Sequence, residues 1–137
     1  MICIGLSLTT ILAGCVMGKS ISAKKKAAVL KRDGGLCVLQ LDGCMGDATV
    51  ADHRVNRGHG GARSLDGFSN LVAACGLCNG RKEAVSGDER ADLVVRGLRV
   101  EPGRTHAHSA ERAREIPVMY ADGLLYRLTD DGRRELA

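Results

Sequence analysis

The amino-acid sequence predicts a small mixed α+β domain that is stapled by a metal ion and extended by a C-terminal helix and β-hairpin. Two observations support this fold class: four cysteines occur as two local pairs, and strand-like segments alternate with helix-like ones around them. At 137 residues the chain has room for one domain. It has one Phe, two Tyr and no Trp, so we expect the cysteine-rich segment to need a cross-link in addition to its core.

Residues 1–18 carry no charge and are mostly apolar. The stretch ending at Cys15 is similar to a bacterial lipoprotein cleavage motif, but a secretory signal begins with basic residues, and the first one here is Lys19. The run is also shorter than the roughly 20 residues of a membrane span. Three interpretations stay open: upstream sequence before a start at Met17, a signal or anchor, and a packed helix. We expect a cytoplasmic protein, with export as the less favoured interpretation.

A basic amphipathic helix is expected next, at the start of a domain covering residues 19–86. Residues 19–34 hold six Lys or Arg side chains against one acid, Asp33, and small apolar residues stand between them. Gly34 and Gly35 end this segment. Such a helix suits a phosphate backbone, although a solvated helix face would have the same composition.

The segment from Cys37 to Val85 predicts the order strand, loop, strand, helix. Residues 48–53 are short, apolar and β-branched, as in a strand. Residues 54–67 are rich in glycine and arginine and predict a loop, which residues 70–75 follow as the returning strand. The segment from Asn79 onward favours a helix.

The central cysteines predict a structural zinc site. Two local pairs of thiolates are the ligands of a closed tetrahedral zinc site, which leaves no position for a reacting water. Six cysteines in all leave a disulfide-stabilised protein as the alternative. We favour zinc, bound by Cys37, Cys44, Cys75 and Cys78.

Residues 87–137 predict an appendage made of a helix and a β-hairpin. Apolar residues at helical spacing lie between Asp88 and Val100, and Pro102 follows them. Asp122-Gly123 is a typical hairpin turn between two strand-like segments. His59, His106 and His108 are assigned to the surface or to loops.

Several elements of the central segment also form a recognisable series. In chain order they are Cys37 and Cys44, A-D-H at 51–53, G-G at 60–61, N-L at 70–71, and C-x-x-C-N-x-x-K from Cys75 to Lys82. The series resembles the HNH endonucleases, and most closely the small HNH proteins of tailed bacteriophages. The resemblance covers about residues 30–85 and implies a ββα-metal fold, also called a His-Me finger.

The resemblance also implies roles for four residues. His53 would be the general base, Asp52 and Asn79 would hold the catalytic divalent ion, and Asn70 would hold the loop that orients His53. The chemistry agrees, because an imidazole titrates near neutral pH and a carboxylate suits Mg²⁺. Asn79 stands where the family name has a second His, and its amide oxygen favours Mg²⁺ or Mn²⁺ over Zn²⁺ or Ni²⁺. As structural alternatives, His53 could be part of the scaffold, and Asn70 and Asn79 could be helix or turn caps.

The implied function is hydrolysis of phosphodiester bonds in double-stranded DNA, in a phage protein of the host cytoplasm. Nearby basic residues are candidates for phosphate contacts: Arg54, Arg57, Arg81 and Lys82. The large terminase of a phage is a further candidate partner. No small-molecule cofactor is expected, and the oligomeric state stays open. The alternatives are a non-catalytic, zinc-stapled DNA-binding module and an exported lipoprotein with disulfides.

Overall fold

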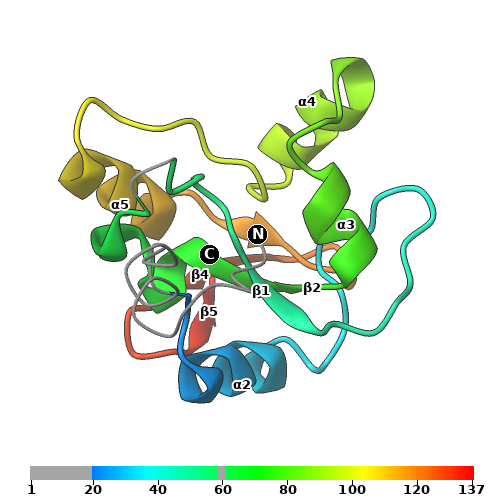
Figure 1. Ribbon diagram of the computed structural model, residues 1–137, viewed down its shortest axis with the longest axis horizontal. Coiled ribbons are helices and arrows are strands. Elements are labelled where there is room, and N and C mark those ends of the chain that lie inside the picture. The colour runs from blue at the N-terminus through cyan, green and yellow to red at the C-terminus, as the bar shows by residue number, and fades with distance from the viewer. Residues whose placement is uncertain (1–19, 59–60) are drawn as a thin grey trace, which may run out of the picture.

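The computed structural model describes residues 20–58 and 61–137, and this part of the chain has the predicted mixed α+β architecture (Figure 1). In chain order the elements are α2 (Ala23–Arg32), β1 (Val50–His53), the 3₁₀ turns η1 (Arg63–Leu65) and η2 (Phe68–Asn70), β2 (Leu71–Ala74), α3 (Gly76–Arg81), α4 (Gly87–Val95), α5 (His106–Glu115), β3 (Val118–Met119), β4 (Leu125–Leu128) and β5 (Arg134–Leu136). The apolar segment 1–18 and His59 lie outside the described residues. Every helix that is described falls short of the length and apolar character needed to cross a membrane.

Strands β1 and β2 form an antiparallel pair at the centre of the molecule. Val50 pairs with Ala74 at one end and His53 with Leu71 at the other. All four residues of β2 are buried, as its apolar sequence requires, whereas β1 is only partly buried. Helix α2 lies on one side of the strand pair and α3 on the other (Figure 1).

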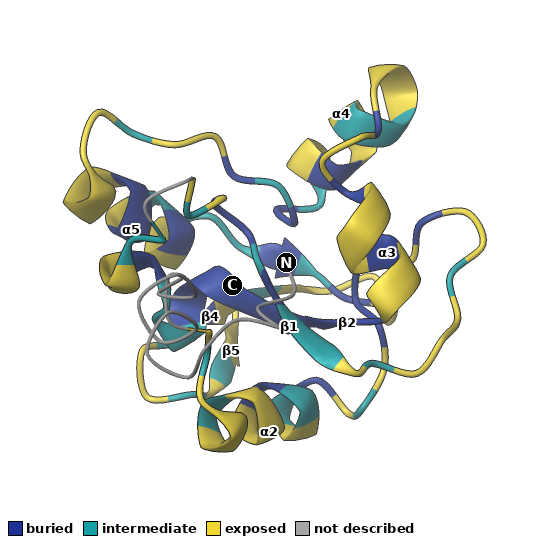
Figure 2. Ribbon diagram, viewed as in Figure 1, coloured by how far each residue is buried: buried dark blue, intermediate teal, exposed yellow. Residues whose placement is uncertain are grey.

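Helix α2 is the predicted basic helix, with narrower bounds than the charge pattern indicated. The Ser22 hydroxyl caps it by accepting a hydrogen bond from the Lys25 N–H at 3.1 Å. Within the helix only Val29 is fully buried, and most of the lysines face solvent (Figure 2). The helix ends before Gly34 and Gly35, which both have a φ of 73° that other residues rarely adopt.

The carboxylate of Asp33 joins α2 to both sheets. It accepts hydrogen bonds from the Arg32 guanidinium at 2.8 and 2.9 Å, from the Ala73 N–H at 2.9 Å and from the Tyr120 hydroxyl at 2.7 Å. A buried carboxylate needs such partners to be stable. Since Ala73 lies on β2 and Tyr120 follows β3, this one side chain connects the cysteine-containing segment to the C-terminal one.

The C-terminal segment contains the predicted helix and hairpin, and one further helix that the sequence analysis missed. Strands β3, β4 and β5 form an antiparallel sheet in that order, and Gly123, with a φ of 79°, lies in the first turn. Helix α5 was missed because its sequence has few large apolar residues. Its buried positions are the small residues Ser109, Ala110 and Ala113, and the Thr105 hydroxyl caps it by accepting a hydrogen bond from the His108 N–H.

Arg54 differs from its expected role at a DNA surface, because the structure buries it. Its side chain is only 1 % exposed. The guanidinium donates hydrogen bonds of 2.5–2.8 Å to the carbonyls of Gly97, Ser69, Ala113 and Ile116. Arg54 therefore ties β1 to η2, to the loop after α4 and to the end of α5.

Replacing Arg54 with Met should destabilise the fold strongly. The change leaves several buried carbonyls without a donor, and each costs about 1–3 kcal/mol. We expect a loss of about 3 kcal/mol or more in the free energy of unfolding, measured by urea denaturation. The control is Arg104→Met, at an exposed arginine, which should change the free energy by less than about 0.5 kcal/mol. Equal stability of the two variants would show that the Arg54 network contributes little.

Candidate functional site

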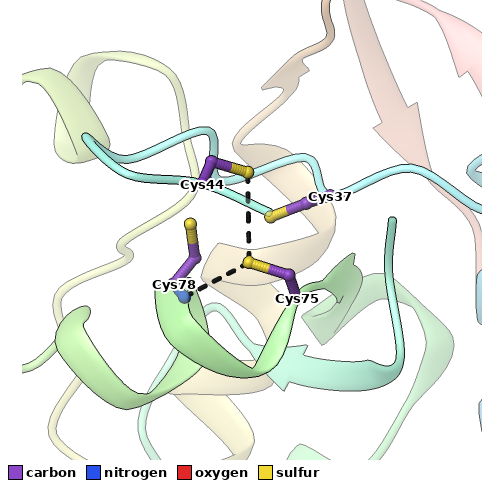
Figure 3. Close-up of side chains that lie close together, drawn as sticks. All are labelled: Cys37, Cys44, Cys75 and Cys78. Atoms are coloured by element: carbon purple, nitrogen blue, oxygen red, sulfur yellow. Dashed lines mark hydrogen bonds between the residues drawn. The ribbon is translucent and has the colours of Figure 1, made fainter. Parts of the chain in front are cut away.

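The four central cysteines come together from two separate parts of the chain. Cys37 and Cys44 lie on the loop between α2 and β1, while Cys75 caps α3 and Cys78 lies in its first turn (Figure 3). Their sulfur atoms all lie within 4.8 Å of one another, and the sulfurs of Cys44 and Cys75 are 3.9 Å apart. All four are free thiols, so the structure does not support a disulfide among them.

This cluster has the dimensions of a tetrahedral zinc site. A Zn–S bond of about 2.3 Å places the sulfurs of a tetrahedron about 3.8 Å apart, which agrees with the 3.9 Å between Cys44 and Cys75. Four thiolates would fill every position around the ion. The cluster could therefore hold a metal such as zinc as a structural ion.

The thiols differ in how readily they lose a proton. Burial alone would raise the pKa of Cys75, but the N–H groups of Cys78 and Met45, together with neighbouring thiols, lower it to about 6. Burial and the thiols of Cys75 and Cys44 raise the pKa of Cys78, and burial raises that of Cys37. Metal binding requires the deprotonated thiols, and a cation would balance their charge in this buried cluster.

A polar pocket of about 270 Å³ lies beside this cluster. It is lined by the end of β1, the loop that follows it, α3 and the turn after α3. Its residues are Asp52, His53, Asn56, Arg57, Gly58, Asn79 and Glu83. The structure thus brings Asp52, His53 and Asn79 to one pocket. The Cys75–Cys78 knuckle begins the helix that carries Asn79, so the thiol cluster and the pocket share α3.

Asp52 is largely buried and is paired with Lys82 inside the protein. The Lys82 ammonium group donates a hydrogen bond of 2.6 Å to Asp52 Oδ2 and another to the carbonyl of His53. Burial raises the pKa of Asp52 to about 6, although the charge of Lys82 opposes this rise. Lys82 is only 1 % exposed, so it supports the pocket from within and, contrary to expectation, does not present its charge to DNA.

His53 is held by a carboxylate that the sequence analysis did not single out. Its Nε2 lies 2.8 Å from Asp66 Oδ1, and the Arg57 guanidinium donates to both oxygens of Asp66 at 2.9 Å. Burial lowers the pKa of His53, as do the charges of Arg57 and Lys82, while Asp66 raises it. The net effect is a lowered pKa, which favours the neutral imidazole, the form able to accept a proton.

Asn70 holds the two ends of the loop that follows β1. Its amide nitrogen donates to the carbonyls of Val55 and Leu65, and its amide oxygen accepts from the Val55 N–H. The side chain is 1 % exposed. These three hydrogen bonds make Asn70 a clamp on the loop between β1 and η1.

The remaining predicted residues lie at the surface of the same region. Asn79 is exposed on α3. It shares the pocket with Glu83, which was not predicted and which accepts a hydrogen bond from Arg99 at 2.9 Å. Arg81 is exposed and donates to the Asp42 carbonyl, which lies on the cysteine-bearing loop.

Sequence reasoning missed Glu83, which lines the pocket, and Asp66, which holds His53 from outside the pocket lining. Glu83 stands four positions after Asn79, a spacing that places two side chains on one helix face and could have indicated it. Asp66 lies 13 residues after His53 across an irregular loop, and no spacing rule connects the two.

Comparison with known proteins found one relative of the chain among curated proteins. The chain is 37% identical to the Gene 4 protein of Mycobacterium phage L5 over 78 residues, which cover 57% of this chain and 72% of that protein. No family model matches the chain. No solved structure matches it either.

Metal analysis should find one zinc ion per chain, bound by the four clustered cysteines. Elemental analysis of protein purified without chelator measures this ratio. Cys75→Ser should lose the ion and lower the melting temperature, because structural zinc binding contributes directly to folding.

The matched control is Cys3→Ser combined with Cys15→Ser, which removes the two thiols outside the described residues. This variant should keep the zinc. Full zinc content in Cys75→Ser, or its loss from the control, would contradict the four-cysteine site.

Proposed function

We propose that this chain, which belongs to the family of the Gene 4 protein of Mycobacterium phage L5, is a phage protein and a metal-dependent DNA endonuclease of the HNH type. The observation that carries the proposal is the pocket that His53 shares with Asp52 and Asn79. A base and two oxygen-bearing side chains in one pocket are what hydrolysis of a phosphodiester bond requires.

The order of elements supports the same function. Strand β1 ends at His53, the loop clamped by Asn70 leads to β2, and α3 follows directly with Asn79. This order of two antiparallel strands and a helix agrees with the ββα-metal fold that the HNH resemblance implies. The four-cysteine cluster at the start of α3 then serves as support, outside the chemistry.

The donor atoms of the pocket suit a hard divalent ion. Asp52 Oδ2 is committed to Lys82, which leaves Oδ1 for a metal, and Asn79 would add its amide oxygen. Glu83 supplies a second carboxylate to the same pocket. Oxygen donors favour Mg²⁺ or Mn²⁺, and such an ion would stabilise negative charge on the phosphate and on the departing oxygen.

His53 performs the proton transfer in this proposal. Its neutral ring removes a proton from a water molecule as the water oxygen attacks phosphorus. The bond between phosphorus and the 3′ oxygen then breaks, and the departing oxygen takes a proton from solvent water, which leaves a 5′-phosphate and a 3′-hydroxyl, as the HNH resemblance implies. Burial favours this role because it keeps the ring unprotonated.

Basic side chains near the pocket offer contacts to the DNA backbone. Three neighbouring hollows share Arg57: the pocket itself, one beside Lys26 and α2, and one beside Arg104 at the start of α5. Lys26, Arg81 and Arg104 are exposed. A strand lying along these hollows would bring its phosphates past His53, and each phosphate contact would make binding weaker at high salt. A role beside a phage terminase in the host cytoplasm stays a prediction from the family resemblance.

One observation favours a second function, a zinc-stapled module that binds DNA without cutting it. Lys82 already neutralises Asp52, so the pocket has less negative charge for a metal than its two carboxylates suggest. A binding module would keep the cysteines and the basic surface but would not depend on His53.

Cleavage of supercoiled plasmid decides between the two functions. With Mg²⁺ or Mn²⁺ the parent protein should nick the plasmid, and EDTA should abolish this. His53→Ala should lower the rate by about 100-fold or more, the usual contribution of a general base.

His108→Ala is the control, since it removes an exposed imidazole outside the pocket. It should cut like the parent. Nicking by His53→Ala at the parental rate would overturn the assignment of the base, and plasmid binding without cleavage would favour the binding module.

A further inference from the structure

We infer that Asp66 is the positioning residue for His53: its carboxylate holds the hydrogen on Nε2 and leaves Nδ1 as the ring's proton acceptor. The hydrogen bond between Asp66 and His53 is present in the structure whether or not the protein is a nuclease. Its catalytic consequence rests on the proposed nuclease function.

The geometry leaves little freedom to this pair. Asp66 Oδ1 is 2.8 Å from His53 Nε2, and both side chains are mostly covered, at 17 and 20 % exposure. Burial alone would raise the pKa of Asp66, but His53 and Arg57 together lower it, so the carboxylate is ionised. An ionised carboxylate only accepts hydrogen bonds, so Nε2 must be the nitrogen that carries the hydrogen.

The backbone around Asp66 is fixed independently of His53. The preceding residue, Leu65, is held through its carbonyl by the Asn70 side chain at 2.8 Å. The carbonyl of Asp66 itself accepts a hydrogen bond of 2.8 Å from the Lys25 ammonium group on α2. The Asn70 amide nitrogen also donates to the carbonyl of Val55, two residues after His53. The Asn70 side chain therefore holds the backbone close to both partners of the hydrogen bond between His53 and Asp66.

The consequence for the ring is a single orientation and a single tautomer. Within the part of the chain that the structure describes, Nδ1 of His53 makes no hydrogen bond, and the ring borders the pocket shared with Asp52 and Asn79. A carboxylate that orients a histidine in this way also stabilises the imidazolium that forms when the ring accepts a proton. Asp66 would therefore act on the rate of the chemical step more than on substrate binding.

Nuclear magnetic resonance of the zinc-loaded full chain tests the hydrogen bond directly. At one mildly alkaline pH, a hydrogen-bonded Nε2–H resonance should appear in the parent and disappear in His53→Ala, which assigns it. The resonance should also be lost in Asp66→Ala and kept in Asp131→Ala, a control at an exposed carboxylate. A parent without this resonance, or a zinc-loaded Asp66→Ala that keeps it, would overturn the inference.

Kinetics then test the consequence for catalysis. Asp66→Ala should lower kcat for plasmid nicking by about 10–100-fold, as expected when the partner of a functional histidine is lost. KM should stay within about twofold, because Asp66 orients the base and does not hold the substrate. An unchanged kcat, or a loss confined to KM, would contradict a positioning role. If the parent cuts no DNA, the proposed nuclease function fails while the resonance still decides the role of Asp66.

Discussion

The gathering of four thiols around one point is the constraint on which the pocket depends. Helix α3 has six residues, too few to be stable by itself, and it begins at Cys75 inside the cluster. The opposite side of the cluster is a loop held to β2 by the Val38 N–H, which donates to the Ala73 carbonyl at 2.9 Å. A metal bound by these thiols would fix α3 against this loop, and with it the positions of Asn79 and Lys82.

Around this cluster the protein uses buried charged groups where other domains use aromatic side chains. Among the residues that the structure describes, Arg54 and Lys82 have the largest fully buried side chains. Asp33 is buried at the junction of α2, β2 and the C-terminal sheet. Each of these groups has its partners. Arg54 donates to carbonyls, Lys82 donates to Asp52 and to one carbonyl, and Asp33 accepts from three donor groups. Such networks are directional, so they specify one arrangement of segments that a small aliphatic core alone would define poorly.

Burial also sets the chemistry of the pocket. It raises the pKa of Asp52 to about 6 and lowers that of His53, and in both cases the neutral form is favoured because a charge loses its hydration. Lys82 opposes the shift of Asp52, and Asp66 opposes the shift of His53. The pKa values of two adjacent residues of β1 are therefore shifted by burial, and such shifts are common at functional sites. The same arrangement explains why Lys82 belongs to the interior.

The sequence by itself determined the features that depend on local spacing. The two cysteine pairs, the strands around residues 50 and 72, the basic helix and the Asp122-Gly123 turn follow from short-range patterns, and the structure has them. Only the tertiary structure decided which charged groups are internal, because an arginine such as Arg54 has the same local pattern whether it contacts solvent or four carbonyls. The pairing of Asp66 with His53 likewise depends on how a loop closes. Helix α5 forms where small residues pack closely, which a pattern of large apolar residues does not reveal. Hydrogen bonds and burial between distant segments are properties of the folded chain. The sequence therefore indicated several residues of the pocket, and their partners were decided by the tertiary structure.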